Sequence, residues 1–247
     1  MAMIAGATPD IEAHGQSMGE LGERFMYYRV DSDDDDTRSK MMDKARAMEG
    51  LEKEAREEIS IAVRGVVSNC KNMDFSKVKM EKCYGDWLAN LVDLTTNLRT
   101  PVKRNYYRRE VIEYTPHKEG PGRMYKACQV LLKSLAVVRG RQEVNEDDYA
   151  VAVKICIDSI QSIRREAVKA LAKTYGRGGV RPKDIAQLTG YQSTESVGYH
   201  LADLSALGLV DRWIDKYKAK HLNAPFLYEM KKKTYDKLQS CGMLDVL

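Results

Sequence analysis

The amino-acid sequence predicts a mainly α-helical protein whose C-terminal part combines three short helices with a pair of β-strands. Between residues 38 and 175, apolar side chains recur at three- and four-residue spacing, which is typical of helices with one packed face. Glycine and proline interrupt this pattern, and the expected strands follow Gly208. Because 247 residues are enough for more than one core, we expect three segments: 1–36, 37–158 and 159–247.

The composition permits a nucleic-acid partner without requiring one. The chain carries 40 lysines and arginines against 36 aspartates and glutamates, so a basic surface must arise from local clustering. Its five cysteines lack metal-ligand spacing, and we expect reduced thiols and no metal site. The sequence has no stretch of roughly 20 apolar residues and no signal-like start, which favours a cytoplasmic protein with no membrane partner.

The first part of the chain predicts one strand and two helical stretches. Met1 to Ala7 has the apolar, small-residue pattern of a buried strand that ends at Thr8-Pro9. The acidic run Asp31 to Asp36 lacks the alternating ligands of a calcium loop, and its oxygens suit the cap of a following helix. Helical patterns then cover residues 38–68 and, after a polar break, residues 77–98.

A basic and aromatic stretch follows the stop at Thr100-Pro101. Its members are Arg99, Lys103, Arg104, Tyr106, Tyr107, Arg108 and Arg109. Such residues suit a phosphate backbone, and they equally suit a solvated surface or a contact between subunits. We expect a short strand at residues 111–114. Two further helices, over residues 123–139 and from the cap at Asn145 to Ser159, are expected to pack antiparallel.

The region after residue 160 predicts a helix-turn-helix unit. We expect helices over residues 164–175, 182–189 and 194–207, with Pro182 opening the second and Ser193 capping the third. In this arrangement the N-terminal residues of the last helix enter the major groove of DNA. Strands at 209–213 and 224–230, joined by a basic turn at 216–220, would form a wing.

The sequence from Gln192 to Val210 resembles the recognition helix and following strand of winged-helix proteins. The resemblance implies double-stranded DNA as the partner, with bases or phosphates facing Gln192, Ser193, Thr194, Ser196 and Tyr199. It implies backbone contacts from Lys183, Arg212, Lys216, Lys218 and Lys220. Glu195 and Asp203 oppose DNA binding because carboxylates repel phosphates, and a winged helix that binds protein is the alternative. We expect His200 and His221 to be packing or surface residues.

The preceding segments resemble parts of AAA+ ATPases. Residues 4–9 and 19–25 resemble the end of the ATPase core, and residues 122–123 with 141–148 resemble the helical lid of the minichromosome-maintenance-like branch. By that resemblance Thr8 matches sensor 1, Arg24 matches the arginine finger, with Arg29 as a second candidate, and Arg123 matches sensor 2. An arginine in such a place stabilises the charge of a transferring phosphoryl group. Surface or helix-capping arginines are the alternative.

The nucleotide chemistry implied by this family needs parts that the sequence lacks. There is no phosphate loop and no strand ending in paired acids for magnesium, so we expect no cofactor and no ATP hydrolysis in this chain alone. ATP and magnesium are expected only for an intact homo-oligomeric, DNA-dependent AAA+ ATPase of replication or mobile-element maintenance, of which this chain would be the C-terminal portion. The alternatives are a stand-alone winged-helix transcriptional regulator with a helical dimerisation domain, and a scaffold that holds another protein.

Overall fold

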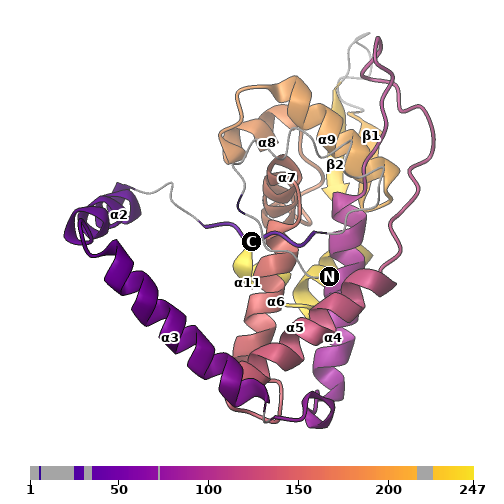
Figure 1. The fold of residues 1–247 in the computed structure, drawn as a ribbon. Helices are drawn as coiled ribbons and strands as arrows, with labels where there is room; N and C mark the ends of the chain where they lie inside the picture. The colour runs from indigo at the N-terminus through magenta and orange to yellow at the C-terminus, as the bar shows by residue number, and fades with distance from the viewer. Residues whose placement is uncertain (1–5, 7–24, 31–34, 72, 216–224) are drawn as a thin grey trace.

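The computed structural model describes residues 6, 25–30, 35–71, 73–215 and 225–247. Within these residues the protein is mainly helical and has one small antiparallel sheet of two strands, which confirms the expected secondary-structure class (Figure 1). The strand expected at residues 1–7 lies outside the described residues except for Gly6. No helix in the described ranges is both long enough and apolar enough to cross a bilayer.

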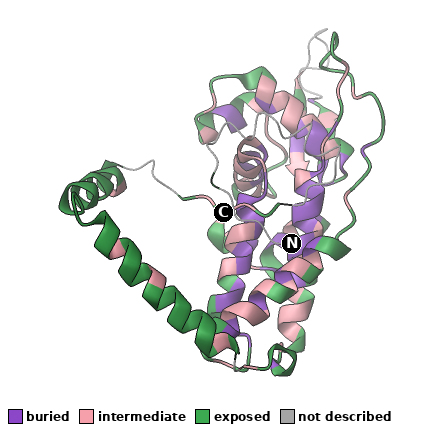
Figure 2. Cartoon of the chain, viewed as in Figure 1, coloured by how far each residue is buried: buried purple, intermediate pink, exposed green. Residues whose placement is uncertain are grey.

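Two exposed helices form an arm that extends away from the rest of the protein (Figure 2). They are α2, Asp35–Ala47, and α3, Glu52–Lys71. Asp35 and Asp36 occupy the first turn of α2, where the positive end of the helix dipole favours carboxylates. A turn at Gly50, with φ of 79°, divides the helical pattern of residues 38–68. The packed face expected there is absent, because no residue of either helix is buried.

Three helices form the central bundle: α4, Lys82–Arg99; α5, Gly122–Val138; and α6, Glu146–Asp158. Their contacts are made by fully or nearly fully buried side chains, among them Leu88, Leu91, Leu94, Met124, Cys128, Leu132, Ala152 and Cys156. The spacing of apolar residues in 123–139 predicts Val138 on the buried face of α5, and this prediction is wrong, because Val138 is 53% exposed whereas Ala136 and Val137 are buried. A short 3-10 helix, η2 (Phe75–Lys77), precedes α4 in the chain. Between the two, Lys79 forms a β-bridge with Glu143.

The cap of α6 confirms a local prediction from the sequence. The Asn145 side chain accepts a hydrogen bond from the Asp148 N–H, and the Asp148 carboxylate accepts one from the Asn145 N–H. Arg139 and Arg141 also donate to Asp148, at 2.6 and 2.8 Å. These bonds lower the pKa of Asp148 despite its burial. The cap therefore fixes both the start of α6 and the turn that leads into it.

A second group of helices, here named the three-helix unit, contains α7, Ser162–Lys173; α8, Pro182–Thr189; and α9, Thr194–Ala206. All three pack on one another. Gly190, with φ of 74°, ends α8, and the Ser193 hydroxyl caps α9 by accepting a hydrogen bond from the Ser196 N–H at 3.1 Å. The apolar spacing of residues 182–189 predicts that Leu188 turns inward with Ile185 and Ala186, and this prediction is wrong, because Leu188 is 61% exposed.

The sheet consists of β1, Val210–Ile214, and β2, Phe226–Met230. The strands are antiparallel, with Val210 opposite Met230 and Arg212 opposite Tyr228. Val180, in the connection between α7 and α8, exchanges two backbone hydrogen bonds of 2.9 Å with Tyr228. The sheet is therefore joined directly to the three-helix unit.

The C-terminal helices return to the bundle. They are α10, Lys232–Ser240, which contacts α4, and α11, Met243–Val246, which contacts α6. The buried Tyr149 hydroxyl donates to the carbonyl of Cys241 at 3.1 Å, and the Asn90 amide donates to the Ser240 hydroxyl at 3.2 Å. Residues that follow the sheet thus pack against helices that precede it in the chain: Tyr149 and Cys241 are 92 positions apart, and Asn90 and Ser240 are 150 apart.

Candidate nucleic-acid interface

The N-terminal turn of α9 presents polar side chains to solvent. Gln192, Ser193 and Thr194 are exposed and Ser196 is half-buried, whereas Val197 holds the opposite side of the turn in the core. Amide and hydroxyl groups of this kind can hydrogen-bond to base edges or to phosphates. Residues 191–206 contain no lysine or arginine, so the helix itself supplies no positive charge.

Tyr199, one turn further along α9, is engaged by two neighbours. Its hydroxyl donates a hydrogen bond to the Glu195 carboxylate, which is the main reason that the pKa of Tyr199 is raised. The Arg104 guanidinium lies over its ring, 5.0 Å from the centroid. Tyr199 would have to give up the Glu195 carboxylate before its hydroxyl could donate to another group.

Arg104 belongs to a folded loop, residues 103–113, that lies against α9. The Asn105 N–H donates to the carbonyl of Val111 at 2.9 Å, and the Glu113 N–H donates to that of Lys103 at 3.1 Å. This loop turns back on itself, but the strand expected at 111–114 is wrong, because only Ile112 bridges, to Arg104. One paired residue on each side is too short a ladder to form a strand.

The tip of loop 103–113 carries the most exposed aromatic side chains of the described residues. Tyr106 and Tyr107 are 83% and 91% exposed, and their rings meet edge to face at 5.2 Å. Arg108 and Arg109 beside them are exposed as well. The other two arginines of this basic stretch are not surface cations, because the side chain of Arg99 is buried on Glu119 and that of Arg104 is buried on Asp203.

Asp203 joins the loop, α9 and the bundle. Its carboxylate accepts hydrogen bonds from Arg104 at 2.5 Å and from Arg164 at 3.1 Å. Arg164 also donates to the carbonyls of Leu98 and Thr100, which are free acceptors at the end of α4. The expectation that Asp203 repels phosphates is therefore wrong, because this carboxylate is 4% exposed and faces two guanidinium groups.

His200 lies beside the same cluster and is held neutral. Burial and the nearby Arg164 charge lower its pKa to about 4, although Asp203 opposes the shift. Its Nδ1 is 3.8 Å from the Asp203 carboxylate, too far for a hydrogen bond. At neutral pH the imidazole therefore adds no positive charge to α9, in agreement with a packing role.

Two of the residues expected to contact the DNA backbone lie on elements that pack against α9. Lys183 is exposed on the first turn of α8, which packs on α9. Arg212 is exposed on β1, and its guanidinium stacks 3.6 Å from the centroid of the Phe226 ring. Stacking fixes the planar group while leaving its edge available for hydrogen bonds. Lys216, Lys218, Lys220 and His221 lie outside the described residues.

Two of the four residues matched to AAA+ ATPases, Arg29 and Arg123, lie in the described part of the chain. Thr8 and Arg24 lie outside it. Arg123 is exposed in the first turn of α5. The Arg29 guanidinium donates to the carbonyl of Asp158 at 3.0 Å and to the Ser162 hydroxyl at 3.1 Å, so it links its own segment to the junction of α6 and α7.

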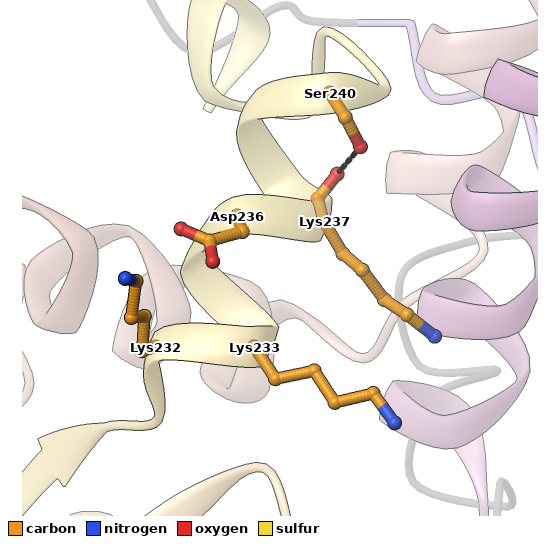
Figure 3. Close-up of a pocket in the computed structure, with 5 residues that line it drawn as sticks. All are labelled: Lys232, Lys233, Asp236, Lys237 and Ser240. Atoms are coloured by element: carbon orange, nitrogen blue, oxygen red, sulfur yellow. Dashed lines mark hydrogen bonds between the residues drawn. The ribbon is translucent and has the colours of Figure 1, made fainter.

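A second basic surface lies on α10, around a shallow depression lined by Lys232, Lys233, Asp236, Lys237 and Ser240 (Figure 3). Lys237 is paired with Asp93 of α4, and the carbonyl of Lys237 accepts a hydrogen bond from the Ser240 hydroxyl. Lys232 and Lys233 are exposed. Among the described residues, no group of three His, Cys, Asp or Glu side chains is placed to hold a metal ion.

No protein-family model, curated protein or solved structure that we compared with the chain matches it. Function is therefore inferred from the chain's own residues and their geometry. The link from Arg104 to Tyr199 and Asp203 is absent from the sequence-based prediction, because these residues are 95 and 99 positions apart and share no local pattern.

Proposed function

We propose that this chain binds double-stranded DNA through a winged helix, in which α9 is the recognition helix and the sheet forms the wing. The observation that carries the proposal is the exposed, polar start of α9, a helix whose three neighbours, loop 103–113, α8 and β1, each carry exposed cationic side chains. In the proposed complex, Gln192, Ser193, Thr194 and Ser196 face base edges or phosphates in the major groove.

The distribution of charge supports this division of contacts. An uncharged helix start can enter a groove between two phosphate backbones if cations beside it neutralise those phosphates. Arg108 and Arg109 belong to loop 103–113, which contacts α9. Lys183 belongs to α8 and Arg212 to β1, which also contact α9. In this proposal Tyr106 and Tyr107 contact sugars or unstacked bases, as exposed aromatic rings do in nucleic-acid sites.

The proposal includes the ATPase connection that the sequence resemblance implies. The bundle of α4, α5 and α6 would be a AAA+ lid, and the chain would be the DNA-binding portion of a DNA-dependent ATPase of replication or mobile-element maintenance. Support comes from the order of the bundle and the three-helix unit, and from Arg123, which is exposed at the start of α5 where sensor 2 is expected. ATP and magnesium would need a phosphate loop from outside this sequence.

A pair of double variants tests the DNA interface. Arg108→Ala with Arg109→Ala removes two charges from the tip of loop 103–113, and Lys232→Ala with Lys233→Ala removes two exposed charges from α10. Fluorescence anisotropy of labelled duplexes measures affinity as salt is raised. We expect the loop variant to bind every duplex at least about tenfold more weakly and to lower the salt slope by about 2, because each lost phosphate contact removes one released counterion.

The α10 variant is the matched control and should keep wild-type affinity within about twofold. Gln192→Ala should change the preference among duplexes without changing the salt slope, because base contacts release no counterions. Equal weakening in both double variants would refute the assignment of the interface to α9. Wild-type protein with no salt-dependent affinity for duplex DNA would refute DNA binding altogether.

A further inference from the structure

Three sulfur atoms from distant parts of the chain meet inside the bundle. Cys128 of α5 and Cys156 of α6 are fully buried, and their Sγ atoms lie 3.9 Å apart. The Cys128 thiol also contacts Sδ of Met26, at 3.9 Å. Met26 is 38% exposed, so it is the outer member of this group. The two thiols therefore lie side by side, one side chain below the protein surface.

The segment that contains Met26 lies across the bundle without regular secondary structure. Residues 25–30 belong to neither a helix nor a strand, so no ladder of backbone hydrogen bonds fixes them. Next to Met26, the Tyr27 N–H donates to the Ser159 hydroxyl at 3.1 Å and holds the segment at the end of α6. A movement of the Met26 side chain would uncover Cys128 while α5 and α6 stay packed.

The two thiols differ in acidity. Because the Cys128 thiol donates its one hydrogen to Met26, the hydrogen between the two cysteines comes from Cys156. This bond lowers the pKa of Cys128 in spite of burial, and the positive charge of Arg99 acts in the same direction. The same bond, together with burial, raises the pKa of Cys156. Cys128 is therefore the thiol that ionises first and acts as the nucleophile.

We propose that Cys128 and Cys156 form a reversible disulfide site, oxidised by hydrogen peroxide and reduced by a dithiol, with Met26 as its cover. The Cys128 thiolate attacks one peroxide oxygen, the O–O bond breaks, and hydroxide leaves and combines with the proton that Cys128 lost. Cys156 then attacks the sulfur of the Cys128 sulfenic acid, and the S–O bond breaks with loss of a second water. Two thiols and one peroxide thus become one disulfide and two waters.

Formation of the bond needs only a local movement. The sulfurs of a disulfide are about 2.05 Å apart, so these two must approach each other by about 1.9 Å from their separation of 3.9 Å. Rotation of the two side chains about their Cα–Cβ bonds moves the sulfurs, and α5 already packs on α6. The proposal does not rest on DNA binding, because neither thiol belongs to the candidate interface.

Intact mass spectrometry tests the site in Cys70→Ser with Cys83→Ser, a variant that removes the two half-buried thiols. The folded variant is treated with hydrogen peroxide and unfolded, and its free thiols are alkylated. Two of the three remaining thiols should escape alkylation, peptide mapping should join Cys128 to Cys156, and dithiothreitol should restore all three. Cys241 is the internal control, because it is equally buried and burial raises its pKa to about 11. It should remain a free thiol.

Single substitutions in the same background separate the two thiols and test the cover. In Cys156→Ser the Cys128 sulfenic acid meets no second thiol, so dimedone should trap it. Cys128→Ser should leave Cys156 modified at least about tenfold more slowly, because its pKa is raised. Met26→Ala should speed disulfide formation at least about fivefold, and Met26→Leu, which keeps the bulk of the side chain, should change it less than about twofold.

Three results would count against these assignments. A folded variant that keeps three free thiols, or that forms the bond only after urea has unfolded it, overturns the proposal. Oxidation of Cys241 as fast as that of the pair also overturns it, because reaction would then not depend on a neighbouring sulfur. An unchanged rate in Met26→Ala overturns the role of Met26 as the cover.

Discussion

At the scale of single residues, Asp203 determines how three parts of the chain meet. Its carboxylate is shared by Arg104 of loop 103–113 and Arg164 of α7, and Arg164 in turn occupies the carbonyls at the end of α4. Burial lowers the pKa of Arg164, and the Asp203 charge opposes that shift. Without this carboxylate, two guanidinium groups would lie close together with no anion between them.

We expect Asp203→Asn to lower the free energy of unfolding by about 3–5 kcal/mol, because it leaves buried arginines without their partner. Urea denaturation followed by circular dichroism measures the change. Asp211→Asn is the matched control, because the Asp211 side chain is 62% exposed and its bond to Lys231 is 3.6 Å long. The control should lose less than about 1 kcal/mol. Equal losses in the two variants would contradict the role given to Asp203.

The candidate interface could be predicted from the sequence only where local chemistry determines it. Ser193 is recognisable as a cap because its hydroxyl bonds to an N–H three residues away, and this locates the start of α9. The contact of Arg104 with Tyr199 depends on the path of a long connection, so neighbouring residues give no sign of it. The buried ion pairs of Asp203 with Arg104 and Arg164 could not be predicted from the sequence for the same reason, because their members lie far apart in the chain.

At the scale of elements, Gly179 joins the three-helix unit to the sheet. Its φ of +88° is left-handed, and a Cβ atom there would lie 2.6 Å from Cζ2 of Trp213 and 3.2 Å from Cβ of Leu227. The next residue, Val180, makes the paired hydrogen bonds to β2. The glycine therefore lets this connection approach the face of the sheet more closely than any other residue would.

Gly179→Ala should destabilise the protein more than Gly178→Ala. Both positions have positive φ, but a Cβ at Gly178 meets nothing within 4 Å. The two variants therefore share the backbone strain, and only Gly179→Ala adds the collision with Trp213. We expect this collision to lower the free energy of unfolding by about a further 1–3 kcal/mol. Thermal unfolding of both variants gives the difference. Equal losses would mean that the indole moves aside freely.

The sequence predicts the ends of the helices better than it predicts which of their side chains are buried. Pro182, Gly190 and the Asn145 cap mark helix ends through interactions within a few residues, and the structure has those ends. The exposure of Leu188 and of the arm depends on which distant elements are available to cover them, and amphipathic spacing alone does not contain that information.

At the scale of the whole molecule, the bundle and the three-helix unit are held together from two sides. Arg164 reaches from α7 to the end of α4, and α10 returns from the sheet to pack on α4. The buried residues of both groups belong to one continuous core. We therefore expect the two groups to unfold together rather than as separate domains.

The two tryptophans of the chain report separately on the bundle and on the sheet that is joined to the three-helix unit. Trp87 packs against Tyr84 and Tyr149 in the bundle, and Trp213 lies on β1. In Trp87→Phe and in Trp213→Phe, the urea midpoint of the remaining tryptophan's fluorescence should coincide with that of circular dichroism in the same sample. Midpoints that separate by more than about 0.5 M in either variant would show independent domains.

The lack of lysine and arginine in α9 has a consequence for how the protein can change. Under the proposed function, the strength of binding is determined by side chains outside the helix, and the preferred base sequence by side chains within it. Substitutions at residues 192–196 can then redirect the protein to another target while its response to ionic strength stays the same. Selectivity and affinity would be free to evolve one at a time.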